Sequence, residues 1–119
     1  MVQWAGITAA KLPSHYVTDM VKVFDRRRHY CMSRLDKLSD YCTYTRPNGA
    51  FYFFVNFSRY LNAKKMTDVD LCRELLSQAL VGAVPGTSFG KEKFVRISYA
   101  LSDENLAKAF DRIEAFLKK

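Results

Sequence analysis

Apolar residues recur every three or four positions between residues 16 and 38, and this spacing predicts one long amphipathic helix. The stripe consists of Val17, Met20, Val21, Phe24, Cys31, Leu35 and Leu38. A helix of ~23 residues is roughly 34 Å long, close to the diameter of about 35 Å expected for a compact chain of this size. The helix therefore crosses the whole domain, and we expect its ends to rest against protein outside this chain.

The residues before the long helix predict a separate short helix. Residues 3–11 suit a helix that Pro13 interrupts, and Ser14 is placed to cap the long helix that follows. We therefore expect residues 1–14 to form a connection rather than part of the main unit.

Two more helices are predicted by their capping signals. Residues 67–70 have the spacing of a capping box, so a helix should run from there to Leu80 and stop at Gly82. Ser102 can cap a last helix that extends to Leu117, with acidic residues in its first turn.

The remaining segments predict strands. Residues 46–49 form a turn signal that leads into an aromatic and β-branched run at 51–57, which suits a strand buried on both faces. Residues 83–86 suit a brief extended piece, residues 87–93 a loop, and residues 94–99 a strand with period-two alternation. The order predicts one mixed α/β (α+β) unit, in which a small antiparallel or mixed sheet of about three strands packs on helices.

Composition is that of one globular domain. The 119 residues are 49% hydrophobic and 26% charged, which excludes disorder of the whole chain. No apolar run approaches the ~18–20 residues of a membrane span, and the first eleven residues lack the features of a secretory signal. The net charge of +7 raises the expectation of anionic partners without choosing among them.

The cysteines indicate a reducing compartment. Cys31, Cys42 and Cys72 are odd in number and widely spaced, so they suit small buried residues better than a disulfide framework or a zinc site. We therefore expect a cytoplasmic protein whose thiols are reduced.

Several residues resemble chemical motifs without supporting them. His15 and His29 lie fourteen residues apart with no carboxylate cluster, so no metal site is predicted. Arg26–Arg28 suit a solvated or interdomain helix face better than a nucleic-acid interface, because no RNA- or DNA-binding motif accompanies them. Ser88 and Lys91 match the S-x-x-K pattern of serine acyl-enzymes, but the partner motifs of that chemistry are missing.

Arg96 is the most informative charged residue. Strand alternation places Phe94, Arg96 and Ser98 on one face, and Val95 and Ile97 on the other. A guanidinium group among apolar neighbours needs a partner and suits a planar carboxylate. From spacing alone, an internal ion pair or an exposed edge arginine remains the simpler interpretation.

The chain as a whole resembles the C-terminal domain of fold-type I, pyridoxal-phosphate-dependent aminotransferases of class I/II, particularly aspartate aminotransferases. The two most specific segments are V-P-G-T-S-F-G at 84–90 and F-V-R-I-S-Y-A at 94–100. Further similarity follows in order along the chain, at residues 3–5, 20–38, 46–52 and 101–117. The long helix is similar to the helix that joins the two domains of that family.

The resemblance implies a substrate-binding role for two residues. Arg96 would bind the α-carboxylate of an amino-acid substrate, and Phe51 would lie near the site. The lysine that binds pyridoxal phosphate in the family, and the other cofactor-binding residues, lie upstream of the similar segment. We therefore expect no catalytic, cofactor-binding or metal-binding residue in this chain. Glu92 and Lys93 replace a glycine often found before the arginine strand, so the path of that loop departs from the family pattern.

The resemblance also implies a larger protein. Residues 1–119 would form a single small domain, with 1–14 a remnant of the connection to an absent large domain. The full-length enzyme would use pyridoxal phosphate, amino acids and 2-oxo acids, and would be a homodimer, whereas this chain alone would be inactive and bind no cofactor. No nucleic acid and no membrane is expected among its partners.

Two alternatives remain open from the sequence. A pyridoxal-phosphate C–S lyase or decarboxylase of the same fold would retain the same arginine. A basic nucleic-acid-binding module would account for the positive charge and for Arg26–Arg28.

Overall fold

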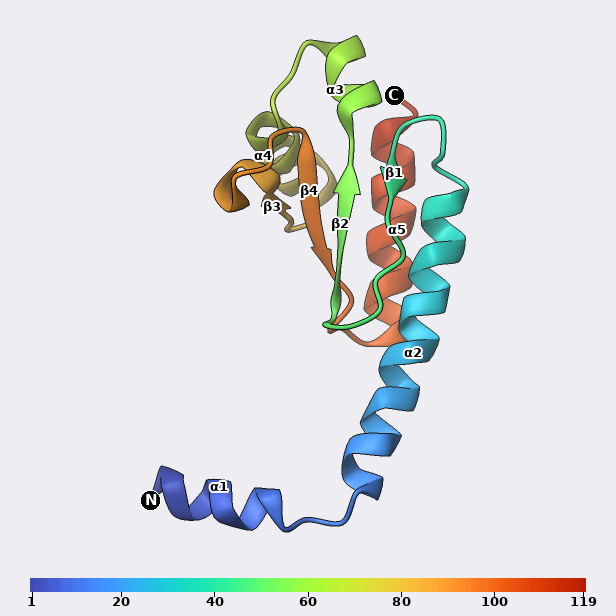
Figure 1. Ribbon diagram of the computed structural model, residues 1–119. Coiled ribbons are helices and arrows are strands. Elements are labelled where there is room, and N and C mark those ends of the chain that lie inside the picture. The colour runs from blue at the N-terminus through green and yellow to red at the C-terminus, as the bar shows by residue number, and fades with distance from the viewer.

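The computed structural model describes residues 1–119, which form five α-helices, four strands and one 3-10 helix, η1 (Figure 1). In chain order these are α1 Val2–Ala10, α2 His15–Asp36, β1 Thr43–Tyr44, β2 Tyr52–Asn56, α3 Ser58–Lys64, α4 Asp68–Ala79, β3 Val84–Pro85, η1 Gly86–Phe89, β4 Phe94–Ser98 and α5 Asp103–Leu117. The mixed α/β class and every predicted helix and strand are confirmed. The elements β1, α3 and η1 were not predicted, because each is too short to carry a periodic pattern of its own.

The strands form one antiparallel sheet in the order β1-β2-β4-β3. Its centre is the pair β2 and β4, in which Phe54 lies opposite Arg96 and Tyr52 opposite Ser98. The sheet has four strands rather than about three, since residues 43–44 pair with the end of β2.

Only one face of the sheet is buried. Phe53 and Val55 of β2 are at most 1% exposed, as is Val95 of β4, whereas Tyr52 on the other face is 39% exposed. The prediction that residues 51–57 are buried on both faces is therefore wrong. An aromatic-rich run can form a one-sided strand when its outward rings pack on one another, as Phe54 does on Phe94 at 4.9 Å between ring centroids.

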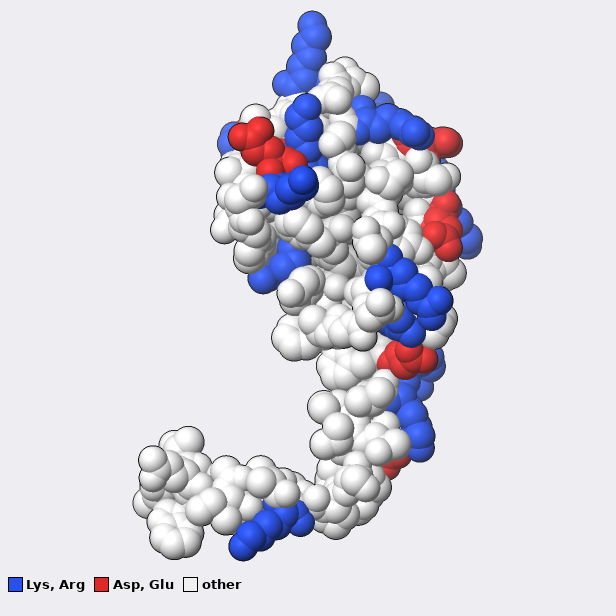
Figure 2. Space-filling view, viewed as in Figure 1, with Lys and Arg blue, Asp and Glu red and all other residues white.

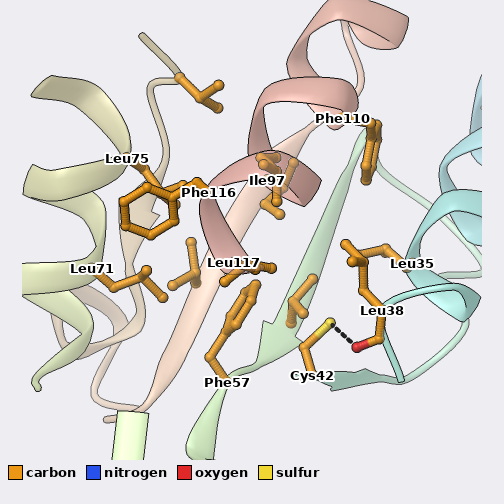
Figure 3. Close-up of a cluster of buried hydrophobic side chains, with 14 of the residues drawn as sticks. Leu35, Leu38, Cys42, Phe57, Leu71, Leu75, Ile97, Phe110, Phe116 and Leu117 are labelled. Atoms are coloured by element: carbon orange, nitrogen blue, oxygen red, sulfur yellow. Dashed lines mark hydrogen bonds between the residues drawn. The ribbon is translucent and has the colours of Figure 1, made fainter. Parts of the chain in front are cut away.

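The hydrophobic core lies between that face and the helices. Figure 3 shows side chains from α2, α4 and α5 meeting those of β4, of the segment between α2 and β1, and of the residue after β2. The labelled residues that form this layer are Leu35, Leu38, Cys42, Phe57, Leu71, Leu75, Ile97, Phe110, Phe116 and Leu117. The helical stripes and the strand alternation thus converge on a single core.

The long helix is confirmed, and half of it lies outside the core. The buried residues of α2 are Cys31 and Leu35, and α1 has none. Both α1 and the first half of α2 project away from the sheet (Figure 1), which gives the molecule a longest dimension of 52 Å. Its radius of gyration is 16.7 Å, larger than the ~13.5 Å of a compact chain of this length. None of the helices combines the length and apolar character of a membrane span.

Arg34 ties the inner half of α2 to α5. Its guanidinium group donates to Asp111 at 2.7 Å, to Glu114 at 3.1 Å and to the Tyr30 hydroxyl at 2.9 Å. The Arg34 side chain is only 13% exposed, so these contacts orient the long helix on the core more firmly than an exposed ion pair would.

The helix caps that the sequence predicts are present at two positions and differ from the structure at two others. The capping box of Thr67 and Asp70 is present, and the Ser102 hydroxyl accepts the Asn105 amide at 3.2 Å. Ser14 makes no side-chain capping bond, so the prediction for Ser14 is wrong. The helix α4 ends at Ala79 with Leu80 as its C-cap, and not at Gly82, because Leu80 adopts the left-handed conformation and the Val81 amide bonds back to the Leu75 carbonyl.

The conformation of Leu80 supports a stability prediction. Leu80 has φ 55° and is 70% exposed, so its side chain gains little from packing and its backbone is strained. Leu80→Gly is expected to raise the free energy of unfolding by about 0.5–1 kcal/mol. The control Gln78→Gly, within the helix, should lower it by about 1 kcal/mol. Urea denaturation of both variants checks this, and equal destabilisation by both would contradict it.

Candidate functional site

Arg96 lies on β4 and extends over the open face of the sheet. Its Cζ atom is 4.7 Å from the centroid of the Phe89 ring and 5.5 Å from that of the Tyr52 ring. Two aromatic rings therefore hold the guanidinium group by cation–π contact, which suits arginine because its flat, weakly hydrated group stacks well.

The guanidinium group of Arg96 has no polar partner within the chain. The Arg96 side chain takes part in none of the ion pairs or side-chain hydrogen bonds. Its partner on the neighbouring strand β2 is the apolar residue Phe54. No side-chain nitrogen is buried without a partner, so the unpaired N–H groups of Arg96 all reach solvent. Of the two simpler interpretations of this arginine, the internal salt bridge is therefore wrong, and so is the edge position, because β4 is paired on both sides. The group is oriented by its neighbours and is free to accept an external anion.

The surface around Arg96 is aromatic. The Phe54 and Phe94 rings stack on each other at 4.9 Å, and the Phe89 ring meets the Phe54 ring edge-on at 6.1 Å. Hydrogen bonds from a guanidinium group to a carboxylate are stronger where apolar side chains exclude water. The arrangement can therefore bind one planar anion and bring an apolar surface close to it.

The turn that carries Phe89 requires glycine at its first position. A Cβ atom on Gly86 would lie 2.3 Å from the Lys91 carbonyl oxygen and 2.7 Å from that of Phe94. The resulting close approach lets the turn fold back against the start of β4. The need for glycine in the V-P-G segment is therefore steric: only a residue without a Cβ atom lets the turn fold back so that Phe89 lies over Arg96.

Phe51 lies beside this site rather than in it. Its ring packs near Phe24 of α2 at 6.3 Å and is 52% exposed. It lines a cleft of about 780 Å³ between α2 and the loop before β2, together with Arg28 and Tyr99. The rings in contact with Arg96 are instead those of Tyr52 and Phe89.

Sequence reasoning missed Tyr52 and Phe89. The antiparallel register could have indicated Tyr52, since a residue paired with Ser98 shares the face of Arg96. Nothing in the local pattern indicated Phe89, because its position depends on the path of the loop.

The basic run on α2 is largely neutralised by acids of the same chain. Arg26 and Arg27 both donate to Asp103, at 2.6 and 2.9 Å, and Arg28 donates to Asp25 at 2.5 Å. Along α2, acidic atoms lie among basic ones on the face seen in Figure 2. The hydrogen bond from Arg27 and the charge of Arg26 lower the pKa of Asp103. Arg26 and Arg27 therefore form ion pairs between α2 and α5, whereas Arg28 pairs with an acid of α2 itself.

The other candidate residues take no part in a shared site. His15 stacks on Tyr16, and His29 bonds the Asp25 carbonyl through Nδ1. Ser88 lies in the 3-10 turn, not in the α-helix that serine acyl-enzyme chemistry needs, and no side-chain hydrogen bond joins it to Lys91. No cluster of three or more His, Cys, Asp or Glu side chains is suited to bind a metal ion.

The three cysteines are free and buried. Burial raises the pKa of the Cys31 and Cys42 thiols to about 12 and that of Cys72 to about 11. They are therefore protonated core residues, not nucleophiles.

Comparison with known proteins shows which family this chain is similar to. Residues 1–113 match the family model described as aminotransferase class I and II. A probable aspartate/prephenate aminotransferase of Aquifex aeolicus is 39% identical over 98% of this chain and 30% of its own length. The aspartate aminotransferase of Thermotoga maritima is 37% identical over 98% of this chain and 28% of its own length.

Solved structures agree with the sequence comparison. The crystal structure of the Thermotoga maritima aspartate aminotransferase superposes with a TM-score of 0.84 at 37% identity, covering 98% of this chain and 28% of that one. The aspartate aminotransferase of Rhizobium meliloti superposes with a TM-score of 0.87 at 34% identity, covering 96% and 30%. The chain therefore spans about 30% of the length of these relatives.

Proposed function

The chain belongs to the class I and II aminotransferases, and from this membership we propose that it serves a larger, aspartate aminotransferase-like enzyme by binding the α-carboxylate of the substrate through Arg96. The observation that carries the proposal is the state of this side chain. It is oriented by Tyr52 and Phe89 and yet has no anionic partner within the chain. An arginine held on a strand with its N–H groups unpaired is a preorganised carboxylate receptor.

The role of Arg96 in the reaction is to bind and orient. Two parallel N–H···O bonds would fix both the position and the plane of the substrate carboxylate. Fixing that plane restricts rotation of the substrate, so the bonds at its α-carbon point in one direction relative to the rest of the enzyme. The reacting groups themselves belong to the part of the protein outside this chain.

Enzymes of this family use pyridoxal phosphate, which supplies the electron sink for chemistry at the α-carbon. The residues of this chain do not fit that group. No lysine lines the cleft of about 780 Å³ beside Phe51, whereas a lysine that binds the coenzyme must be enclosed with it. The proposal is therefore that the cofactor is held elsewhere in the protein and that the chain alone is inactive.

The proposal includes the organisation of the whole protein. Residues 1–119 act as the small domain, with 1–14 as its connection, and a large domain covers the exposed apolar side chains of α1 and α2, such as Trp4, Val17 and Met20. The substrates are an amino acid and a 2-oxo acid, and the enzyme is a homodimer. A cytoplasmic location is supported by the three unpaired cysteines.

Carboxylate titration tests the role of Arg96. Adding succinate to the 119-residue chain, with chloride at equal ionic strength as reference, should shift the Arg96 Nε–H resonance selectively in nuclear magnetic resonance spectra. Arg96→Gln should weaken succinate binding by about 10- to 150-fold, since hydrogen bonds to charged groups contribute about 1.5–3 kcal/mol. Arg112→Gln, which changes an exposed arginine of α5, is the matched control and should leave binding unchanged. A response of Arg96 no larger than that of the other arginines would contradict the proposal.

A further inference from the structure

Asp68 is the one charged residue buried in the core region, at 3% exposed. It is the first residue of α4, and its carboxylate accepts both the Thr87 amide and the Thr87 hydroxyl at 2.8 Å. Burial by itself would raise the pKa of Asp68, but the hydrogen bonds from Thr87 and from backbone amides outweigh it and lower the pKa. The carboxylate is therefore ionised, and both of its oxygen atoms accept hydrogen bonds from Thr87 in the turn η1.

That turn is short and closed, so Thr87 controls its position. Thr87 is the second residue of the four-residue helix η1, and Phe89 is the last. The Gly90 amide bonds to the Thr87 carbonyl and the Lys91 amide to the Gly86 carbonyl, both at 3.0 Å. Because the turn is held as one unit, displacement of Thr87 displaces Phe89 with it.

Phe89 is held only weakly by packing of its own. Its side chain is 50% exposed, and its ring lies against the Arg96 guanidinium group and edge-on to Phe54. Since the Arg96 guanidinium group has no hydrogen bond within the chain, the Phe89 and Tyr52 rings are what orient it. The backbone of Tyr52 is fixed by strand pairing, whereas the position of Phe89 depends on the turn.

We propose that Asp68 is a positioning residue for Arg96. It anchors Thr87, the anchored turn places Phe89, and Phe89 orients the guanidinium group that meets the carboxylate. This inference rests on the proposed role of Arg96, but its structural part can be measured without any ligand. Asp68 itself touches neither Arg96 nor a substrate.

The variant Asp68→Asn tests the proposal, with Asp70→Asn as the matched control. Both residues lie in the first turn of α4, so either change removes a negative charge that favours the helix N-terminus, but only Asp68 contacts the turn. In Asp68→Asn the nuclear Overhauser contact between Phe89 and Arg96 should be lost. Succinate binding should fall by about 5- to 10-fold, since the receptor is no longer preorganised. In Asp70→Asn both should be retained, although its unfolding midpoint also falls.

The second pair of variants serves if Asp68→Asn does not fold. Thr87→Val removes the hydroxyl donor but keeps the shape, and Thr87→Ser restores it. Thr87→Val keeps the amide bond to Asp68 and loses only the hydroxyl bond, so the proposal requires the Phe89–Arg96 contact to weaken in Thr87→Val and to be retained in Thr87→Ser. If Asp68→Asn or Thr87→Val lost stability but kept both the Phe89–Arg96 contact and the succinate response, the proposal would be overturned, because Asp68 would then only stabilise α4.

The two proposals can fail separately. If Arg96 of the parent protein does not respond to succinate, the proposed function fails, whereas the Phe89–Arg96 contact still decides whether Asp68 positions Arg96.

Discussion

Gly86→Ala is expected to destabilise the protein by about 3 kcal/mol. The added Cβ would lie 2.3 Å from the Lys91 carbonyl oxygen and 2.7 Å from the Phe94 carbonyl oxygen. Both are backbone atoms, so relief requires the turn to move away from β4 rather than a side chain to rotate. Such a movement would also carry Phe89 away from Arg96. Urea denaturation and the succinate titration measure the two effects.

Gly82→Ala is the control for this prediction. A Cβ at Gly82 meets nothing within 4 Å, so this change should stay within about 0.5 kcal/mol of the parent protein. If the two variants were equally stable, the close approach of the turn to β4 would not exist in solution.

Phe53→Ala is expected to destabilise the protein by about 3–5 kcal/mol, because it removes a fully buried ring and leaves a cavity. The Phe53 side chain is 1% exposed and packs near the Tyr44 and Tyr99 rings at 5.4 and 5.5 Å. Phe54→Ala, one residue later, should cost only about 1 kcal/mol, since that ring stacks on Phe94 over the open face. Thermal or urea unfolding of the pair is the measurement.

The contrast between Phe53 and Phe54 tests which face of the sheet is covered. If both losses were equally large, the open face would also be covered in this chain and Arg96 would not be accessible. The comparison therefore bears on the proposed site as well as on the core. The same substitutions should affect succinate binding in the opposite order, because Phe54 and not Phe53 shares the face of Arg96.

The local elements of this protein are largely set by its sequence. Helical spacing over residues 16–38, the capping box at Thr67 and Asp70, and the alternation of residues 94–98 each express a preference of nearby residues, and each appears in the structure. The same alternation placed Arg96 and Ser98 on one face of the strand. Side-chain periodicity is a local property, so no knowledge of the rest of the fold was needed for it.

Tertiary structure decided what surrounds those elements. The strand at residues 51–57 is apolar on both sides, so only the placement of the helices determines that Phe53 is buried and Tyr52 open. The end of α4, capped at Leu80, depends on a backbone bond, not on the glycine two residues later. The partners of Arg96, which are Tyr52 across the sheet and Phe89 in a turn anchored by Asp68, are brought together from distant parts of the chain. Such contacts arise from chain topology and from the packing of whole elements, which a local pattern of residues does not contain.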